Sequence, residues 1–247
     1  MFINLDTNTI SIMLLALSVG GLLKGVISFG FPLIALPILS LVLPPKSAIF
    51  LLFFSLIFLN IREIKFKNLK DYKRIIPLGS GIFIGIIVGS IIFHKVENEF
   101  ISKMIGLTII LSAITNFYGL KINQSLLINK WFSLSYGLFA GLIGGMTTIV
   151  GPLIVIYLVS LNLKKQLFSE MVSLSVFSCL APLYGIFFIY QNVTFNDFFI
   201  SALISIPAVL MQIIGFKIRD IIPQKTFKNI TLSILVIIGI LVLYKNW

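Results

Sequence analysis

The chain has 247 residues, of which 58% are hydrophobic, and its mean hydropathy is +1.10. This composition excludes a soluble domain, and apolar runs of about 20 residues predict a helical membrane protein in a lipid bilayer. The runs do not alternate between apolar and polar residues, which argues against a membrane β-barrel. The net charge of +11 comes from basic residues in the loops between the runs, so we expect no nucleic-acid partner.

The first half of the chain contains five apolar segments. They cover residues 8–28, 32–43, 47–61, 75–93 and 100–118. A Gly-Phe-Pro break separates the first two segments, and the loop at 62–74 carries six basic residues. The N-terminus lacks the basic region and cleavage pattern of a signal peptide, so we expect the first segment to remain as a membrane helix.

The second half repeats this plan, with segments at 132–143, 149–161, 167–190, 197–216 and 229–244. We divide the single integral membrane domain into a first repeat (1–120), an inter-repeat loop (121–130) and a second repeat (131–247). A helix of about 12 residues spans only about 18 Å of a roughly 30 Å hydrocarbon core. The pairs at 8–43 and 132–161 therefore either cross fully or form re-entrant hairpins.

The expected fold is an all-α polytopic membrane protein with two inverted five-segment repeats. It has eight full transmembrane helices plus short or re-entrant half-helices, eight to ten segments in total. Four loops carry 14 of the 19 basic residues, which places these loops on the cytoplasmic side of a cytoplasmic membrane. They lie at 62–74, 119–131, 161–168 and 217–228.

Loop charges also indicate that the two halves are inverted. The loop after the third segment is basic in the first half, whereas its counterpart at 191–196 has no basic residue. After the fourth segment the difference is reversed. The loop of the first half, HKVENE at 94–99, has few basic residues, whereas the loop of the second half, KIRDIIPQKTFK at 217–228, is rich in them. An odd number of segments per half is what inverted repeats require, and such repeats are typical of alternating-access transporters.

Each half opens with a hydrophobic stretch weakened by glycine and proline, which indicates a transporter binding site. The matching residues, at shifts of 116 and 115 positions, are Gly21 with Gly137, Gly25 with Gly141, and Pro37 with Pro152.

These motifs resemble the sulfite exporter TauE/SafE family, also called the toluene sulfonate uptake permease family. In that family each half opens with a Gly-x3-Gly helix, followed by a glycine-rich tip and an apolar stretch with a proline. Here the two tips lie within 25–32 and 144–152. The resemblance covers essentially the whole chain and implies transport of small anions or of sulfur and organic acids.

The broken segments suggest an anion site built from backbone groups. A helix that begins at membrane depth has free N–H groups and a positive dipole end. Two such ends, one in each tip, are expected to converge on a small anionic substrate, with hydroxyl donors beside them. The alternative is that the small residues only allow close helix packing. The predicted substrate-binding residues are Lys24, Gly25, Ser28, Gly30, Phe31, Gly144, Gly145, Thr147, Thr148 and Gly151.

Three ionisable residues within or beside apolar runs have two interpretations each. Lys24 either supplies a positive charge at the first tip or extends along its helix to a water surface. Glu170 is either a proton-coupling carboxylate or an acid that complements a helix dipole. His94 is expected to be a water-exposed loop residue. No catalytic or metal-binding motif is present, and no cofactor is expected.

We therefore expect a secondary transporter of small anions such as sulfite, organosulfonates or related organic acids, working by alternating access. The alternatives are a membrane-embedded enzyme or subunit acting on a lipid-linked substrate, and an anion channel. A coupling ion, a homo-oligomer and the direction of transport are left open.

Overall fold

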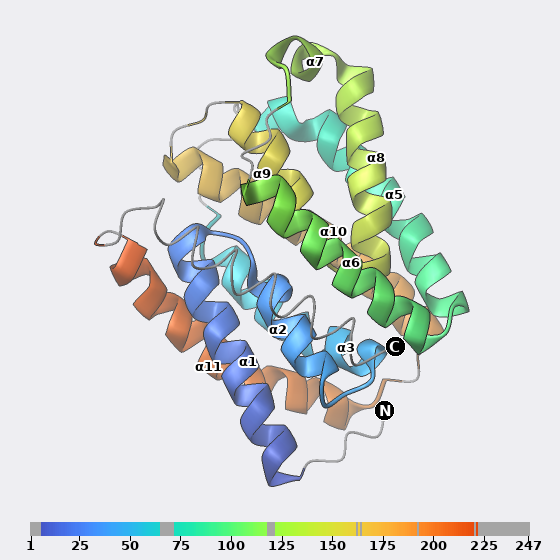
Figure 1. The fold of residues 1–247 in the computed structure, drawn as a ribbon, viewed down its shortest axis with the longest axis vertical. Helices are drawn as coiled ribbons and strands as arrows, with labels where there is room; N and C mark the ends of the chain where they lie inside the picture. Colours follow the sequence, from blue (N-terminus) through green and yellow to red (C-terminus); the bar gives the residue numbers. More distant parts are fainter. Residues whose placement is uncertain are drawn as a thin grey trace.

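The computed structural model describes residues 6–64, 72–117, 122–161, 163, 165–191, 193–219 and 221. In this part of the chain the regular elements are all helices, joined by turns and loops, and there are no strands. Figure 1 shows long and short helices packed into one bundle. The expected segment at 229–244 lies outside the described residues. The elements are α1 (Thr7–Ile27), α2 (Phe31–Ser40), α3 (Pro45–Ile61), the 3-10 helix η2 (Lys73–Ile75), α5 (Ile76–Lys95), α6 (Asn98–Phe117), α7 (Gln124–Ile128), α8 (Lys130–Thr147), α9 (Gly151–Ser160), α10 (Lys165–Tyr190) and α11 (Phe195–Arg219).

Four of the described helices are long and apolar enough to cross a membrane: α1, α5, α11 and the part of α10 from Leu167 to Tyr190. Helix α1, with 21 residues, is about 31 Å long. Helices α2 and α9 have only 10 residues each. The first pair of each half therefore joins a longer helix to a half-length one. Helix α8 extends to Thr147, beyond the expected segment at 132–143.

The break between α1 and α2 is a tight turn. Ser28 follows α1 in the left-handed conformation, with φ of 70°, and Gly30 precedes α2 with φ of 95°. Only glycine adopts such angles without strain, which explains Gly30 but not Ser28. Pro32 lies in the first turn of α2, where its missing N–H removes no helical hydrogen bond.

The break between α8 and α9 begins in the same way but ends differently, because Val150 before α9 is right-handed, with φ of −87°. Thr148 ends α8 in the left-handed conformation, with φ of 61°, and Pro152 lies in the first turn of α9. Thr148 and Pro152 follow their counterparts Ser28 and Pro32 by 120 positions, and α9 and α10 begin 120 positions after α2 and α3. The predicted shift of 116 was therefore wrong. Gly21 and Gly25 correspond to Gly141 and Gly145.

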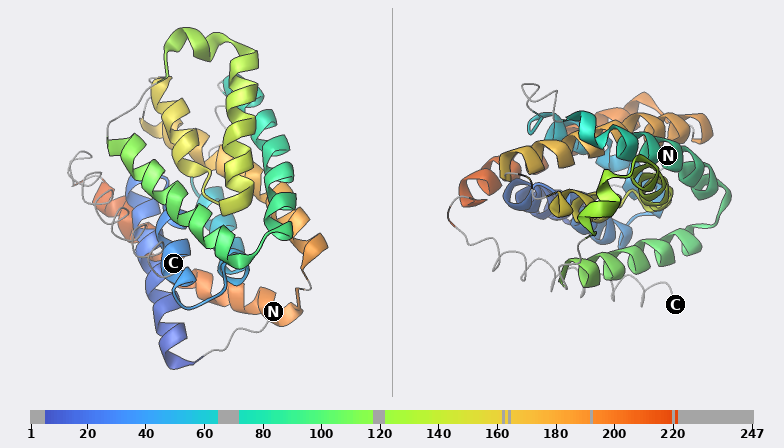
Figure 2. Two further views of the ribbon diagram at one scale, coloured as in Figure 1. Left: turned by 45° about the vertical axis from the view of Figure 1, so that its right-hand side comes forward. Right: turned by 90° about the horizontal axis from the view of Figure 1, so that it is seen from above.

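Glycines allow two pairs of helices to pack backbone to backbone. Figure 2 shows α5 and α8 side by side, and a Cβ atom added at Gly81, Gly85 or Gly89 of α5 would collide with carbonyl groups of α8. Helices α1 and α11 meet in the same way, because a Cβ atom at Gly21 or Gly25 would collide with α11. In both pairs the residue numbers of the two helices rise together, so each pair runs parallel.

Several helix ends meet at one end of the bundle, which we call the Glu63 end. Lys24 in the last turn of α1 lies 3.5 Å from Glu63, two residues past α3, so α1 and α3 finish together. Ser173 near the start of α10 also contacts Glu63, and Arg219 at the end of α11 contacts the carboxylate as well. The described ends of three loops predicted to lie inside, those at 62–74, 161–168 and 217–228, thus lie at one end of the bundle.

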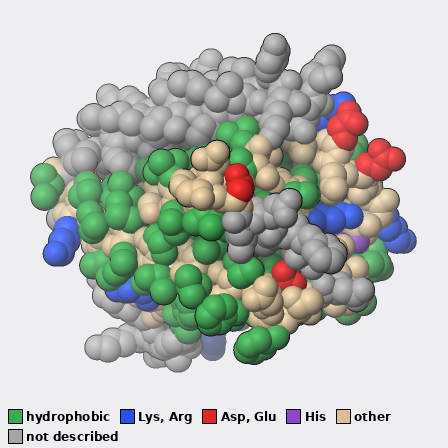
Figure 3. All heavy atoms as spheres, turned by 90° about the horizontal axis from the view of Figure 1, so that it is seen from below, with side chains coloured by type: hydrophobic (Ala, Val, Ile, Leu, Met, Phe, Trp, Pro, Cys, Tyr) green, Lys and Arg blue, Asp and Glu red, His purple; other side chains and the backbone are tan. Residues whose placement is uncertain are grey.

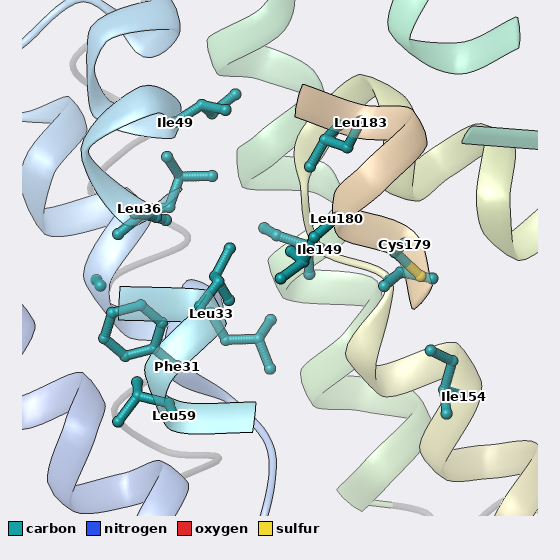
Figure 4. Close-up of a cluster of buried hydrophobic side chains, with 14 of the residues drawn as sticks. Phe31, Leu33, Leu36, Ile49, Leu59, Ile149, Ile154, Cys179, Leu180 and Leu183 are labelled. Carbon is teal, nitrogen blue, oxygen red and sulfur yellow. The ribbon is translucent and has the colours of Figure 1, made fainter. Parts of the chain in front are cut away.

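Apolar side chains cover the outside of the bundle as well as its core. Leu15, Phe139 and Ile189 are exposed, and Figure 3 shows hydrophobic side chains over much of the described part of one face. Such a surface is what a lipid bilayer requires. Inside, Figure 4 shows Leu33 of α2 and Ile149 of the second break in one buried cluster.

The inter-repeat stretch 121–130 was expected to be a loop, but it contains α7 and the first residue of α8. The side chain of Asn123 caps α7 by accepting a hydrogen bond from the Ser125 N–H, and that of Asn129 caps α8 in the same way from Trp131.

Candidate functional site

The strongest candidate site is a buried group of charged side chains at the Glu63 end. Its centre is Lys24, whose side chain is 3% exposed. The ammonium group donates to the Ser28 carbonyl oxygen at 2.8 Å, to Ser173 Oγ at 3.0 Å and to Glu63 Oε2 at 3.5 Å. The interpretation that Lys24 extends along its helix to a water surface is therefore wrong.

The carboxylate of Glu63 is also buried, with 3% of its side chain exposed. Besides Lys24, Oε2 accepts hydrogen bonds from Ser173 Oγ at 2.6 Å and from Ser169 Oγ at 3.2 Å. These two serines are four residues apart on α10, so they lie on the same face of that helix. Helix α10 thus presents two hydroxyl groups to a carboxylate at the end of α3.

Arg219 brings a second positive charge from the last residue of α11. Its Nε–H donates to the Val26 carbonyl oxygen at 2.9 Å, and its Nη2 donates to the hydroxyl of Ser28. Nη2 also lies 3.7 Å from Glu63 Oε1. Arg219 therefore connects the turn after α1 with the carboxylate, and we call Lys24, Ser28, Glu63, Ser169, Ser173 and Arg219 the Lys24 cluster.

Glu170 lies beside this cluster on α10 and is also buried. Its Oε2 accepts a hydrogen bond from the hydroxyl of Tyr72 at 3.2 Å. Tyr72 immediately precedes η2 and α5, so this bond connects the start of α5 with the start of α10. The Glu170 carboxylate thus holds the start of α5 against the start of α10 at the Glu63 end.

Placing charges in this environment is unfavourable without specific partners. A lysine at the centre of a membrane helix costs roughly 2.5–3.5 kcal/mol on insertion scales, and ionisable residues in such positions mark substrate or ion pathways. Here Lys24 and Arg219 face one closely held carboxylate, Glu63. The Lys24 cluster thus combines two cations and one carboxylate in a buried position.

The other predicted residues of the first tip are Gly25, Gly30 and Phe31, which take part in the packing and the turn between α1 and α2. Gly25 packs against the backbone of Gln212 and Gly215 in α11. Gly30 precedes α2, and Phe31, the first residue of α2, is fully buried against Gly20. No described side chain caps the start of α2, which leaves its first N–H groups available as donors.

The second tip contains hydroxyl groups and small residues. Thr147 Oγ1 donates to the Ile143 carbonyl oxygen and accepts from the Ile149 N–H, while Thr148 Oγ1 donates to the Thr147 carbonyl oxygen. Gly145 packs against α5, and Gly144 lies close to Val150. Gly151 begins α9 with open space around it. The five predicted residues of the second half thus lie next to one another at the second tip.

The sequence analysis missed Glu63, Ser169, Ser173 and Arg219. Glu63 and Arg219 were grouped with the loop charges because each lies where an apolar run ends. Two signals were nevertheless present. A lysine in a membrane segment needs an anionic partner, and Glu63 is one of only eight acidic residues in the chain. The Ser169-x3-Ser173 spacing places two hydroxyls on one helical face.

His94 was expected to be a water-exposed loop residue, which was wrong. It lies in the last turn of α5, half-buried, with its ring stacked 5.0 Å from that of Tyr190. Its Nδ1 lies 3.3 Å from Gln191 Nε2. His94 and Glu170 thus lie near opposite ends of α10, about 30 Å of helix apart, and do not share a cavity. Within the described residues no three metal-ligating side chains gather.

Long apolar helices, an apolar outer surface and a buried charged cluster between helices define a polytopic integral membrane protein. The chain belongs to the sulfite exporter TauE/SafE family, whose model matches residues 12–242, nearly the whole length. This is a family of membrane transporters. Comparison with the curated proteins and with the solved structures gave no match.

Proposed function

We propose that this protein is a secondary transporter of small anions such as sulfite, organosulfonates or related organic acids in the cytoplasmic membrane. One observation carries the proposal. In a chain of the sulfite exporter family, Lys24 and Arg219 converge on a buried carboxylate beside an uncapped helix start. Cations and free N–H groups are the donors that an oxyanion such as sulfite prefers.

The proposed substrate site is formed by Lys24, Arg219 and Ser28 together with the backbone from Gly30 to Phe31. Gly25 allows α11 to approach closely enough for Arg219 to reach the turn after α1. The second tip, from Gly144 to Gly151, supplies hydroxyl and backbone groups to the opposite part of the pathway.

The mechanism we propose is alternating access between two inverted repeats, at 1–120 and 131–247. The directions of the helices support it. Lys24 and Tyr72 both contact the start of α10, so α1 ends where α5 begins. Because α8 runs parallel to α5, α1 and α8 point in opposite directions. The first helix of each half also packs against the fourth segment of the other half, as a two-fold relation requires.

The count of eight full transmembrane helices belongs to the same proposal. We assign α1, α3, α5, α6, α8, α10, α11 and the segment at 229–244 as crossings, and α2 and α9 as half-helices. The loops at the Glu63 end are placed on the cytoplasmic side because they are rich in lysine and arginine.

Uptake of labelled sulfite, sulfonates and carboxylates into proteoliposomes tests this function. We expect saturable uptake by the wild type and loss of most of it in Lys24→Ala, since the substituted protein keeps only one of the two cations at the site. Lys103→Ala is the matched control, because Lys103 forms an exposed ion pair with Glu99 on the surface of α6.

Rates are expressed per amount of folded protein, judged by monodisperse elution in detergent. Equal uptake by the two lysine variants would remove Lys24 from the substrate site. Absence of uptake of every anion by the wild type would contradict the transport function itself.

A further inference from the structure

The ammonium group of Lys24 has no hydrogen left for a substrate in this structure. An ammonium has three N–H donors. Lys24 uses them on the Ser28 carbonyl oxygen, Ser173 Oγ and Glu63 Oε2. The side chain is almost fully buried, so water does not compete for these hydrogens. An anion can bind to Lys24 only if it replaces one of the three acceptors.

Glu63 is the acceptor that an anion would replace. Its contact with Lys24, at 3.5 Å, is longer than the contacts with Ser28 and Ser173 at 2.8 and 3.0 Å. It is also the only anionic acceptor of the three. A second anion beside an ionised Glu63 would be repelled by a like charge in surroundings that screen charge poorly.

The two oxygens of Glu63 differ in a way that suits a proton carrier. Oε2 accepts from Lys24, Ser169 and Ser173. Oε1 is buried and has no hydrogen-bond partner among the described residues, although Nη2 of Arg219 lies 3.7 Å away. Arg219 is more exposed than Lys24 or Glu63, at 18%, so water reaches the cluster most readily on the Oε1 side.

We propose that Glu63 couples anion transport to protons, by holding the site closed when ionised and admitting the anion when protonated. This rests on the proposed transport function. A proton from the aqueous phase binds to Oε1, and the neutral acid releases its ionic contacts with Lys24 and Arg219. The substrate anion then takes the place of the carboxylate charge. On the other side of the membrane the anion leaves, the proton dissociates from Oε1, and the carboxylate closes the site again.

For a singly charged substrate this cycle keeps the charge of the Lys24 cluster constant. Within the cluster, Lys24 and Arg219 face either the Glu63 carboxylate or the substrate anion. One proton therefore moves with each anion. Among the described residues, Arg62 adjoins Glu63 in the chain, and Glu170 on α10 is a second buried carboxylate that accepts a hydrogen bond from Tyr72 before α5. Glu170 is thus the alternative proton carrier that an experiment must separate from Glu63.

The coupling acts in both directions, because the effect of a proton on anion affinity equals the effect of the anion on proton affinity. Coupling between sites is typically about 5–150-fold. We expect a change toward acidic pH to tighten anion binding about tenfold in the wild type, and we expect no such change in Glu63→Gln, whose amide imitates the protonated acid.

The test measures uptake of labelled methanesulfonate and of sulfite into proteoliposomes with an acidic exterior, together with the interior pH reported by an enclosed dye. Methanesulfonate is included because its charge does not change across the neutral range. For the wild type we expect an acidic exterior to accelerate uptake and the interior to acidify with anion entry. Glu63→Gln should still exchange labelled for unlabelled anion, which also shows that it is folded, but should not respond to the pH gradient.

Glu99→Gln is the matched control, because this exposed glutamate also pairs with a lysine, and it should behave as the wild type. Two results would overturn the proposal: wild-type uptake without response to the gradient and without proton entry, or loss of coupling in Glu170→Gln but not in Glu63→Gln. If the Glu63 variant does not fold, the dye measurement on the wild type still tests proton coupling, and retained coupling in Glu170→Gln then supports Glu63 as the carrier. Absence of wild-type uptake of both anions would instead contradict the transport function.

Discussion

At the scale of single residues, Lys24 is accommodated by acceptors from three helical segments rather than by water. Ser28 lies in its own turn, Glu63 follows α3, and Ser173 belongs to α10. Replacing a buried ion pair as a whole is often tolerated, whereas removing one partner leaves an uncompensated buried charge. For the Lys24–Glu63 pair, removing one partner should therefore lower the stability of the protein more than neutralising both.

Lys24→Met is predicted to destabilise the protein by about 3–5 kcal/mol, because Glu63 loses its closest cation. Adding Glu63→Gln should recover much of this loss, since the amide carries no charge. Thermal unfolding in detergent measures both changes. A double variant no more stable than Lys24→Met would show that the pair does not interact as the structure indicates.

The sequence predicted Lys24 as a site residue because a charge inside an apolar run is conspicuous. It did not predict that Glu63 and Arg219 would join it. Both residues lie at the edges of apolar runs, and hydropathy assigns such edges to loops. Which helix ends meet depends on how the helices pack, and that information is spread over many weak contacts.

At the scale of helices, glycine rows determine which helices meet and in which direction. Gly81, Gly85 and Gly89 bring α5 against α8, and Gly21 and Gly25 bring α1 against α11. Packing of small residues at four-residue intervals is a main source of helix association in membranes, where burial of apolar surface contributes little. These rows hold the first helix of each half against a helix of the other half.

Gly85→Ala is predicted to destabilise the protein by about 1–3 kcal/mol, because the added methyl group collides with the carbonyl oxygen of Leu138. Gly79→Ala, on the same helix, adds a methyl group where no atom lies within 4 Å, and should be neutral or stabilising because alanine favours helix. Thermal unfolding compares the two. Equal losses at both positions would contradict close packing of α5 on α8.

Sequence analysis located nearly all the described helices but misaligned the halves by four residues. Gly137, Gly141 and Gly145 follow one another at four-residue spacing, so a Gly-x3-Gly motif matches equally well after a slip of one helical turn. The turns at Ser28 and Thr148 resolve this ambiguity, but neither residue is a glycine, and left-handed backbone at serine or threonine has no recognisable sequence signal.

At the scale of the whole molecule, each tip has a left-handed residue at the end of its first helix, but the two tips carry different side chains. The first tip has Lys24 and Ser28, and at the corresponding positions the second has Gly144 and Thr148. The charged cluster at the Glu63 end therefore has no charged counterpart at these positions of the second tip. A transporter built from two related halves would thus bind its anion and its proton mainly with residues around the first tip.

The most direct test of the proposed carrier function is counterflow in proteoliposomes. Vesicles are loaded with unlabelled sulfite and diluted into labelled sulfite, and the entry of label is followed. We predict that the internal anion accelerates entry of label and produces a transient accumulation, because a carrier returns faster when loaded. Entry that neither saturates nor responds to internal sulfite would indicate a channel, and absence of entry would contradict anion transport by this protein.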